Sequence, residues 1–108
     1  MRNDYMLTKD QIVDVAQGFG ACIASNMITV EGCKVGYMYR DESNSPFNGW
    51  IFLSGNESQT YLDDSENLAM FDTNTIANYD SDIVPFLTLP VGTECERNGK
   101  GILIEVVK

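Results

Sequence analysis

The sequence contains sixteen Asp and Glu residues but no histidine, and this limits the chemistry its side chains can do. Histidine is the commonest general base and a frequent metal ligand, so its absence excludes Ser–His and Cys–His nucleophilic sites and His-based metal centres. The cysteines, Cys22, Cys33 and Cys95, form no CxxC pair, which excludes a zinc knuckle or a thioredoxin-like motif. We expect them to be free thiols that act as small buried apolar residues in or beside strands.

The acids of the middle of the chain suggest calcium, because carboxylate and amide oxygens are its usual ligands. The EF-hand template nevertheless fails. With Asp72 in the first position, Ile76 replaces a ligand, Ala77 replaces the required glycine and Ile83 replaces the bidentate Glu. We therefore expect no metal site. The acidic and amide side chains concerned are Asp63, Asp64 and Glu66, followed by Asp72, Asn74, Asn78, Asp80 and Asp82.

Other motifs for catalysis or cofactor binding are also missing. Paired carboxylates can hydrolyse glycosides, but sixteen acids place some pairs close together by chance. The pair Gly18-x-Gly20 lacks the third glycine of a dinucleotide loop and follows a predicted helix instead of a strand. The sequence contains neither GxxxxGK[ST] nor GxSxG. We expect no catalytic residue and no cofactor.

Charge is distributed unevenly along the chain. Residues 41–96 hold eleven acids and no Lys or Arg, whereas the remaining residues hold five acids and seven bases, giving a formal net charge of −9. Binding to a phosphate backbone needs Lys and Arg to replace counterions, so nucleic acid is excluded as a partner. The charge distribution alone favours simple solubility, with attraction of a cationic protein partner as the alternative.

An amphipathic helix is predicted near the N-terminus. Thr8 and Gln11 have the spacing of a capping box. The stripe Ile12, Val15, Ala16 and Phe19 follows with helical spacing, and Gly18 and Gly20 mark its end.

The next segments read as strands. Residues 21–30 and 33–40 are strand-like runs joined at Glu31-Gly32, which predicts a hairpin. A polar loop follows over 41–49, and residues 50–53 (WIFL), apolar on both faces, predict a central strand.

The second half of the chain mixes short elements. Residues 67–71 predict a strand, and short helices are expected from Asn74 or Thr75 to Tyr79 and from Asp82 to Leu87. A terminal hairpin over 93–107 turns at Asn98-Gly99.

Together these elements predict an α+β fold: a mostly antiparallel sheet of about five strands, an N-terminal amphipathic helix and short helices in the second half. At 108 residues we expect one domain, 1–108. The N-terminal residues form no apolar signal core, and no apolar run approaches the roughly 18 residues of a membrane helix, so a cytoplasmic protein without a membrane partner is expected.

Several separated motifs, in order from about Ala21 to the end, resemble a family of small bacterial immunity-protein-like domains. They are Lys34-Val35-Gly36-Tyr37-Met38-Tyr39-Arg40, Gly49-Trp50 with Phe52, Ser54-Gly55 with Glu57, Tyr61-Leu62, Asp72-x-Asn74-Thr75-Ile76-Ala77-Asn78-Tyr79-Asp80 and Pro90-Val91-Gly92. The resemblance implies an antidote that binds a bacterial toxin domain and blocks it without chemistry of its own.

Two hypotheses follow. In the first, the chain is a non-enzymatic immunity protein whose acidic surface covers a basic toxin. The residues that would bind this partner are Tyr61, Asp63, Asp64, Glu66, Tyr79, Asp80 and Asp82. In the second, it is a small-ligand-binding protein or enzyme that uses a carboxylate and tyrosine pocket near Trp50. The oligomeric state stays open.

Overall fold

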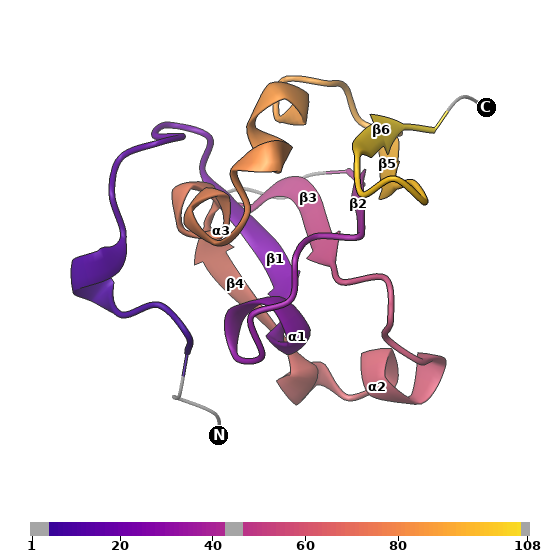
Figure 1. The fold of residues 1–108 in the computed structure, drawn as a ribbon, viewed down its shortest axis with the longest axis horizontal. Coiled ribbons are helices and arrows are strands. Elements are labelled where there is room, and N and C mark those ends of the chain that lie inside the picture. The colour runs from indigo at the N-terminus through magenta and orange to yellow at the C-terminus, as the bar shows by residue number, and fades with distance from the viewer. Residues whose placement is uncertain (1–4, 43–46, 107–108) are drawn as a thin grey trace.

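A six-stranded sheet with the strand order β4-β1-β3-β2-β5-β6 organises the molecule (Figure 1). The computed structural model describes residues 5–42 and 47–106. The strands are β1 (Ala21–Ser25), β2 (Tyr37–Arg40), β3 (Phe47–Leu53), β4 (Leu68–Asp72), β5 (Glu94–Arg97) and β6 (Leu103–Glu105). The α-helices are α1 (Asn26–Thr29), α2 (Gln59–Asp63) and α3 (Thr73–Tyr79), and the 3-10 helices are η1 (Lys9–Gln11), η2 (Ser65–Asn67) and η3 (Ser81–Phe86).

The sheet is mostly antiparallel. β1 pairs in parallel with β3 and antiparallel with β4, and the β2–β3, β2–β5 and β5–β6 pairs are all antiparallel. This confirms the predicted α+β class and a mostly antiparallel sheet, with six strands in place of about five.

β3 is central, as its apolar sequence predicts. It lies between β1 and β2, and its Trp50 and Phe52 are fully buried with their rings stacked at 6.0 Å between centroids. The Trp50 indole N–H donates to the Leu87 carbonyl oxygen at 3.1 Å, so burial leaves this polar group satisfied.

The hydrophobic core lies between one face of the sheet and the pair α3 and η3. Successive side chains of a strand point to opposite faces of the sheet. The residues of β1, β2, β3 and β5 that point toward α3 and η3 are therefore covered by both layers, and they are apolar. The core residues include Cys22, Ala24, Met38, Phe52 and Cys95 from the sheet and Ile76, Ala77, Ile83 and Leu87 from the helical side.

The predicted N-terminal helix is wrong beyond its first turn. The Gln11 side chain accepts a hydrogen bond from the Thr8 backbone N–H at 2.8 Å, as a capping box requires, but only the 3-10 turn η1 forms. Residues 5–20 then cross the outside of α3 as an irregular strap (Figure 1). Asn74 and Asn78 of α3 hold this strap through its backbone, and these side-chain bonds replace the bonds of the expected helix.

The predicted hairpin between residues 21–30 and 33–40 is also wrong. The Ser25 side chain accepts from the Met27 N–H at 3.1 Å and caps α1, which ends β1 at that point. β3 lies between β1 and β2, so these two strands do not pair.

The short elements of the second half are confirmed, with the helix caps two or three residues earlier than predicted. Asp72 caps α3 by accepting from the Asn74 N–H at 2.9 Å, and Asp80 caps η3 by accepting from the Asp82 N–H at 3.1 Å. The terminal hairpin is β5 and β6, joined through Asn98, whose side chain accepts from the N–H groups of Lys100 and Ile102.

Parts of two predictions lie outside the described residues: 43–46 of the polar loop and residue 107 of the last strand. Among the residues that are described, no helix has the length and apolar character needed to cross a membrane.

Candidate protein interface

The predicted partner residues of α2 and η2 form one exposed acidic segment. Asp63, Asp64 and Glu66, which we call the acidic turn, are all exposed. Ser58 caps α2 by accepting from the Tyr61 N–H at 3.1 Å, and Asp64 caps η2 by accepting from the Glu66 N–H at 3.0 Å. These caps form because Ser and Asp side chains accept readily from free N–H groups at helix starts.

Two asparagine side chains fix the acidic turn to the fold. Asn67 Nδ2 donates to the Tyr61 carbonyl oxygen, and Asn26 Nδ2 donates to the Glu66 carbonyl oxygen, both at 2.9 Å. Asn26 is buried at the end of β1, so the backbone of the acidic turn is anchored to the sheet while its carboxylates face solvent. Tyr61 is half-buried beside them.

Tyr79 and Asp80 have internal partners instead. The Tyr79 hydroxyl donates to the Thr29 carbonyl oxygen and accepts from the Leu7 N–H, each at 3.1 Å. The Asp80 side chain is only 1% exposed and accepts from the Val35 N–H at 2.9 Å and from Arg97 Nη2 at 2.6 Å. A carboxylate placed in this way has no surface to offer a partner, so Asp80 stabilises the fold.

Asp82 is exposed but lies apart from the acidic turn. Its carboxylate accepts from Arg97 Nη1 at 3.0 Å, and 55% of its side chain is accessible. Figure 1 shows α2 and η3 toward opposite ends of the molecule, so the predicted residues do not form one continuous surface (Figure 1). Within residues 5–42 and 47–106, the recorded ion pairs join Arg97 to Asp80 and Asp82.

Two of the acids around α3 accept hydrogen bonds from backbone N–H groups. Asp72 and Asp80 cap α3 and η3, as described above. In the part of the chain that the structure describes, no three His, Cys, Asp or Glu side chains are grouped so that they could hold a metal ion.

Trp50 provides no ligand pocket. It is fully buried, its indole N–H is bonded to Leu87, and the Arg40 guanidinium lies 5.8 Å from its ring centroid. A fully enclosed side chain presents no surface to a ligand, so Trp50 itself does not line the carboxylate and tyrosine pocket that was predicted near it, and that pocket stays a prediction.

The cysteines are free thiols. Burial raises the pKa of Cys22 to about 12 and that of Cys95 to about 11, with the Glu105 charge adding to the second shift. Both thiols are therefore protonated near neutral pH, and thiolate nucleophiles are not available from them.

A hollow of about 780 Å³ lies where the ends of β2, β3 and β5 meet. Tyr37, Leu53 and Glu96 of these strands line it, together with the turn formed by residues 54–57. Glu57 shapes this turn by accepting from the Ser54 N–H at 2.8 Å and the Gly55 N–H at 3.0 Å. The Ser-Gly-x-Glu spacing, one of the motifs that carry the family resemblance, is the sequence signal for this turn.

The comparison with protein families decides the class of the protein. Residues 22–107 match the family model described as the Immunity protein Imm33 domain. The chain belongs to the Imm33 family. This confirms the resemblance inferred from the motifs. No curated protein and no solved structure matches the chain.

The residues that match the Imm33 family model do not include the strap. The match begins at Cys22, the second residue of β1, so residues 5–20 lie outside it. Asn74, Asn78 and Tyr79, which hold the strap, lie inside the Imm33 match.

Proposed function

We propose that this Imm33 domain neutralises a bacterial toxin in the cytoplasm by binding it, without chemistry of its own. The family match carries the proposal, because immunity proteins act on protein toxins. The complete lack of histidine and the raised pKa of Cys22 and Cys95 support a binding role over a catalytic one.

We further propose that the acidic turn attracts a basic surface of the toxin. Asp63, Asp64 and Glu66 are exposed and lie in the stretch of the sequence that has no Lys or Arg. Like charges gathered on one surface attract a cationic protein and raise its association rate in a salt-dependent way. Tyr61 is placed to supply an aromatic contact, and Asp82 adds a second exposed acid on η3.

Capture from a lysate of the source organism tests this function in two steps. The immobilised chain is washed at low and then at high salt, and the eluted proteins are identified by mass spectrometry. Each retained protein is then expressed in a bacterial host with and without the chain. We expect a basic protein that elutes at high salt and stops growth unless the chain is present.

The variant Asp63→Asn/Asp64→Asn/Glu66→Gln separates charge attraction from immunity in the same assay. We expect it to retain less toxin at moderate salt. A matched variant, Asp10→Asn/Asp14→Asn/Glu31→Gln, changes the net charge equally at acids outside the acidic turn and should behave like the wild type. If no retained protein is toxic, or if the chain fails to protect against one that is, the proposed function is wrong.

A further inference from the structure

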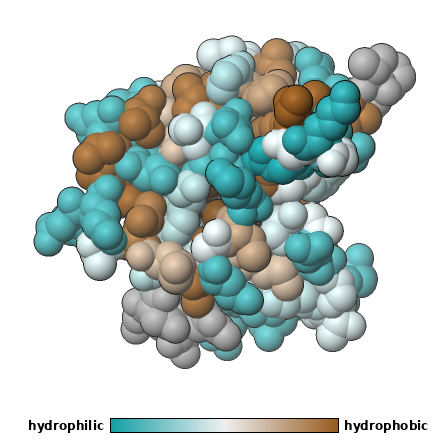
Figure 2. Space-filling model, in the orientation of Figure 1, coloured by the Kyte–Doolittle hydropathy of each residue, from teal (hydrophilic) through white to brown (hydrophobic). Residues whose placement is uncertain are grey.

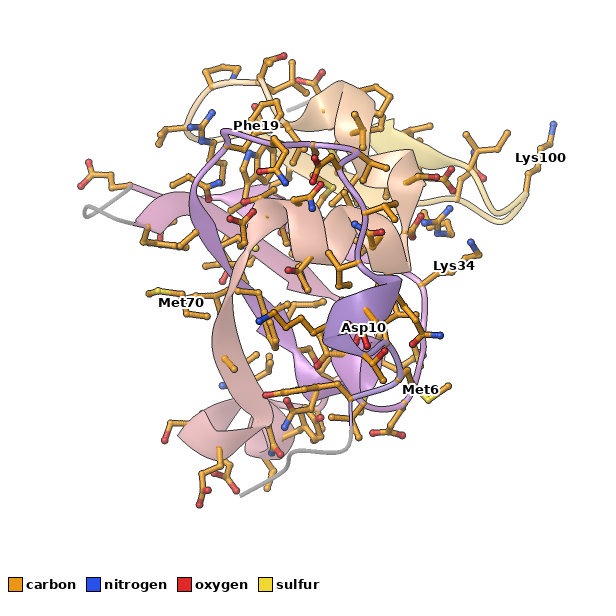
Figure 3. All side chains as sticks on the ribbon, turned by 90° about the vertical axis from the view of Figure 1, so that its left-hand side faces the viewer. Met6, Asp10, Phe19, Lys34, Met70 and Lys100 are labelled. Atoms are coloured by element: carbon orange, nitrogen blue, oxygen red, sulfur yellow. The ribbon has the colours of Figure 1, made fainter. Side chains whose placement is uncertain are left out.

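β4 is an edge strand whose backbone is uncovered on one side. It lies at one end of the strand order, with β1 on its inner side and, within the described residues, no strand on its outer side. Figure 3 shows β4 toward the viewer, with Met70 pointing away from α3 (Figure 3). An edge strand presents a row of unpaired N–H and C=O groups, and these groups can bind another extended chain.

The register of β4 against β1 shows which groups these are. The Thr73 N–H donates to the Gly20 carbonyl oxygen at 2.9 Å, and this pair continues the β1–β4 register. Bonded and unbonded pairs alternate along an antiparallel ladder. Every second residue counted back from Thr73 therefore bonds to β1, and the residues between them direct their backbone groups away from it. These outward-directed residues are Leu68, Met70 and Asp72.

Met70 is the residue whose N–H and C=O groups are both open. No hydrogen bond to either group is recorded in the part of the chain that the structure describes. The Leu68 N–H, in contrast, donates to the Ser65 carbonyl oxygen at the end of η2. We define the outer edge as the Leu68 C=O, the Met70 N–H and C=O, and the Asp72 N–H. It offers donors and acceptors at every second residue, which is the spacing of an extended chain.

β4 lacks the features that usually protect an edge strand. Lysine, proline, a bulge or a very short strand discourages pairing with another chain. The sequence of β4, LAMFD, contains neither Lys nor Pro, and its five residues pair with β1 in an unbroken register. β6, at the other end of the strand order, has only three residues. Of these two strands, β4 is therefore better suited to accept a further strand.

Acids lie at both ends of the outer edge. The acidic turn precedes β4, and the exposed Asp72 ends the strand. Asp64 and Asp72 also cap helices, but the ion pairs recorded within residues 5–42 and 47–106 involve none of these acids. A segment that binds along β4 therefore meets negative charge at each end.

The chain's own cations do not balance this charge. Lys9 lies beside β4, where it lines a hollow together with Phe71, but it forms no ion pair among the described residues. The other described cations lie on β2 and β5, which β1 and β3 separate from β4, or on the opposite side of the molecule from Met70 in Figure 3; they are Arg40, Arg97, Lys34 and Lys100 (Figure 3). The acidic turn and Asp72 together outweigh Lys9, so the outer edge favours a basic segment.

We propose that the outer edge of β4 binds an extended segment of the toxin, which adds a strand to the sheet and carries a lysine or arginine that reaches the acidic turn. This inference rests on the proposed function and specifies how the toxin is held. Main-chain hydrogen bonds supply the affinity in strand addition. The toxin residue opposite Met70 shares a face with Met70 and Ile23, so an apolar side chain fits there.

A second copy of the chain is a poor occupant of the outer edge. Two antiparallel β4 strands paired about Met70 would place Asp72 of one copy opposite Leu68 of the other, next to its acidic turn. Like charges placed close together across paired strands are destabilising. A basic segment gains attraction at the same positions.

Amide hydrogen exchange with a pair of peptides tests the site on the full chain. One short peptide alternates valine and threonine with a lysine at each end, and its control has glutamate in place of each lysine. We expect excess lysine peptide to slow the exchange of the Met70 and Asp72 amides at least about tenfold, because these amides point to solvent in the free chain. The Ala69 and Phe71 amides, which already bond to β1, should not change. The glutamate peptide should bind roughly tenfold more weakly.

Two substitutions at Met70 separate the backbone from the side chain. Met70→Pro removes the outward N–H without removing a β1–β4 bond, since proline is tolerated on an edge strand where its nitrogen faces solvent. Met70→Leu keeps the N–H and an apolar side chain. We expect Met70→Pro to bind the lysine peptide roughly tenfold more weakly than Met70→Leu does.

The exchange measurement on the wild type decides the inference even if Met70→Pro fails to fold. Failure of the lysine peptide to protect the Met70 and Asp72 amides would overturn it. Equal binding of the two peptides, or equal binding by the two folded variants, would also overturn it.

The growth assay separates this inference from the proposed function. If the wild type protects against the captured toxin and Met70→Pro protects equally well while remaining folded by circular dichroism, the outer edge is not the docking site and immunity stands. Lost protection in folded Met70→Pro, with protection kept in Met70→Leu, supports the outer edge. If the wild type gives no protection, immunity itself fails, and the peptide measurements still decide whether the outer edge binds a strand.

Discussion

At the scale of single residues, Gly36 marks a close approach of two chain segments. Its N–H donates to the Leu53 carbonyl oxygen, and its carbonyl oxygen accepts from the Arg97 N–H, both at 2.9 Å. A methyl group at Gly36 would overlap the Ser54 carbonyl oxygen, which is backbone and has little freedom to move. The glycine is therefore required where β2 passes the turn after β3.

Substituting Gly36 tests this contact. Gly36→Ala should lower the free energy of unfolding by about 1–3 kcal/mol because the two backbones must separate. Gly99→Ala is the matched control, since nothing lies within 4 Å of its added methyl group, and it should change stability by less than about 0.5 kcal/mol. Urea unfolding measures the free energy of unfolding of both variants. Equal stabilities for the two variants would show that the close approach of the two backbones does not require a glycine at position 36.

Glu57 makes stability depend on pH. Burial alone would raise the pKa of this carboxyl, but hydrogen bonds from Ser25, Ser54 and the local backbone lower it below its ordinary value of 4.5. A carboxyl with a lowered pKa in the folded state stabilises the fold above the ordinary value, and this contribution is lost as the pH falls through the folded pKa.

Replacing Glu57 with Gln measures this contribution. Glu57→Gln should lower the free energy of unfolding by roughly 1 kcal/mol at pH 7, since hydrogen bonds to a charged group are lost. The difference from the wild type should shrink as the pH falls below 4.5, where the wild-type carboxyl also loses its charge. Glu31→Gln, at an exposed position, should show no such trend. A difference at Glu57 that does not change with pH would contradict the account.

At the scale of elements, the strap depends on two asparagines one helical turn apart on α3. Asn74 Oδ1 accepts from the Val15 and Ala16 N–H groups at 2.8 Å, and its Nδ2 donates to the Val13 carbonyl oxygen at 2.9 Å. Asn78 bonds only to Val13 of the strap. Figure 2 shows hydrophobic residues at the left of the molecule, where the strap lies in Figure 1, and Val13 and Val15 are exposed there (Figure 2). Hydrogen bonds thus hold the exposed part of the strap, whereas Ala16 belongs to the core and Phe19 packs against it.

Removing these amides should release the strap locally. In Asn74→Ala we expect the amide hydrogens of Val15 and Ala16 to exchange at least about tenfold faster, because their acceptor is lost. In Asn78→Ala only the Val13 amide should respond. Hydrogen exchange followed by NMR distinguishes the two. Unchanged exchange at Val15 and Ala16 in Asn74→Ala would show that the strap has another anchor.

The strap also explains why the predicted helix failed. The capping box at Thr8 and Gln11 and the spacing of Ile12, Val15 and Ala16 are genuine local signals. The hydrogen bonds that hold the strap in place of a helix come from Asn74. Asn74 is far from the strap in the sequence, so no local sequence pattern reveals these bonds. The terminal hairpin was predictable because its signal, Asn98-Gly99, lies within the turn itself.

The failed hairpin has a similar cause. Residues 21–30 contain a cap signal at Ser25 that competes with a long strand, and β3 supplies the partner that β1 was expected to find in β2. Strand order depends on which segments bury each other's faces. The apolar sequence of β3 predicts its central position but not which neighbours it separates.

At the scale of the whole molecule, the charge distribution was predictable and the exposure of each acid was not. Asp80 and Asp82 lie two residues apart, yet Asp80 is enclosed by Val35 and Arg97 while Asp82 reaches solvent. Arg97 lies 17 residues beyond Asp80 and reaches it only through the fold. Which side chains share the face of the sheet opposite α3 and η3 was also hidden, because they come from six different strands in the register of the folded sheet.

The salt dependence of association tests the central claim, that an acidic immunity protein docks a basic toxin. Stopped-flow mixing with the captured toxin gives the association rate constant over a series of ionic strengths. The rate of the wild type should fall steeply with salt, and so should that of Asp10→Asn/Asp14→Asn/Glu31→Gln. Asp63→Asn/Asp64→Asn/Glu66→Gln should associate roughly tenfold more slowly at low salt, with a flatter dependence. Equal rates and equal salt dependence for all three proteins would contradict the claim.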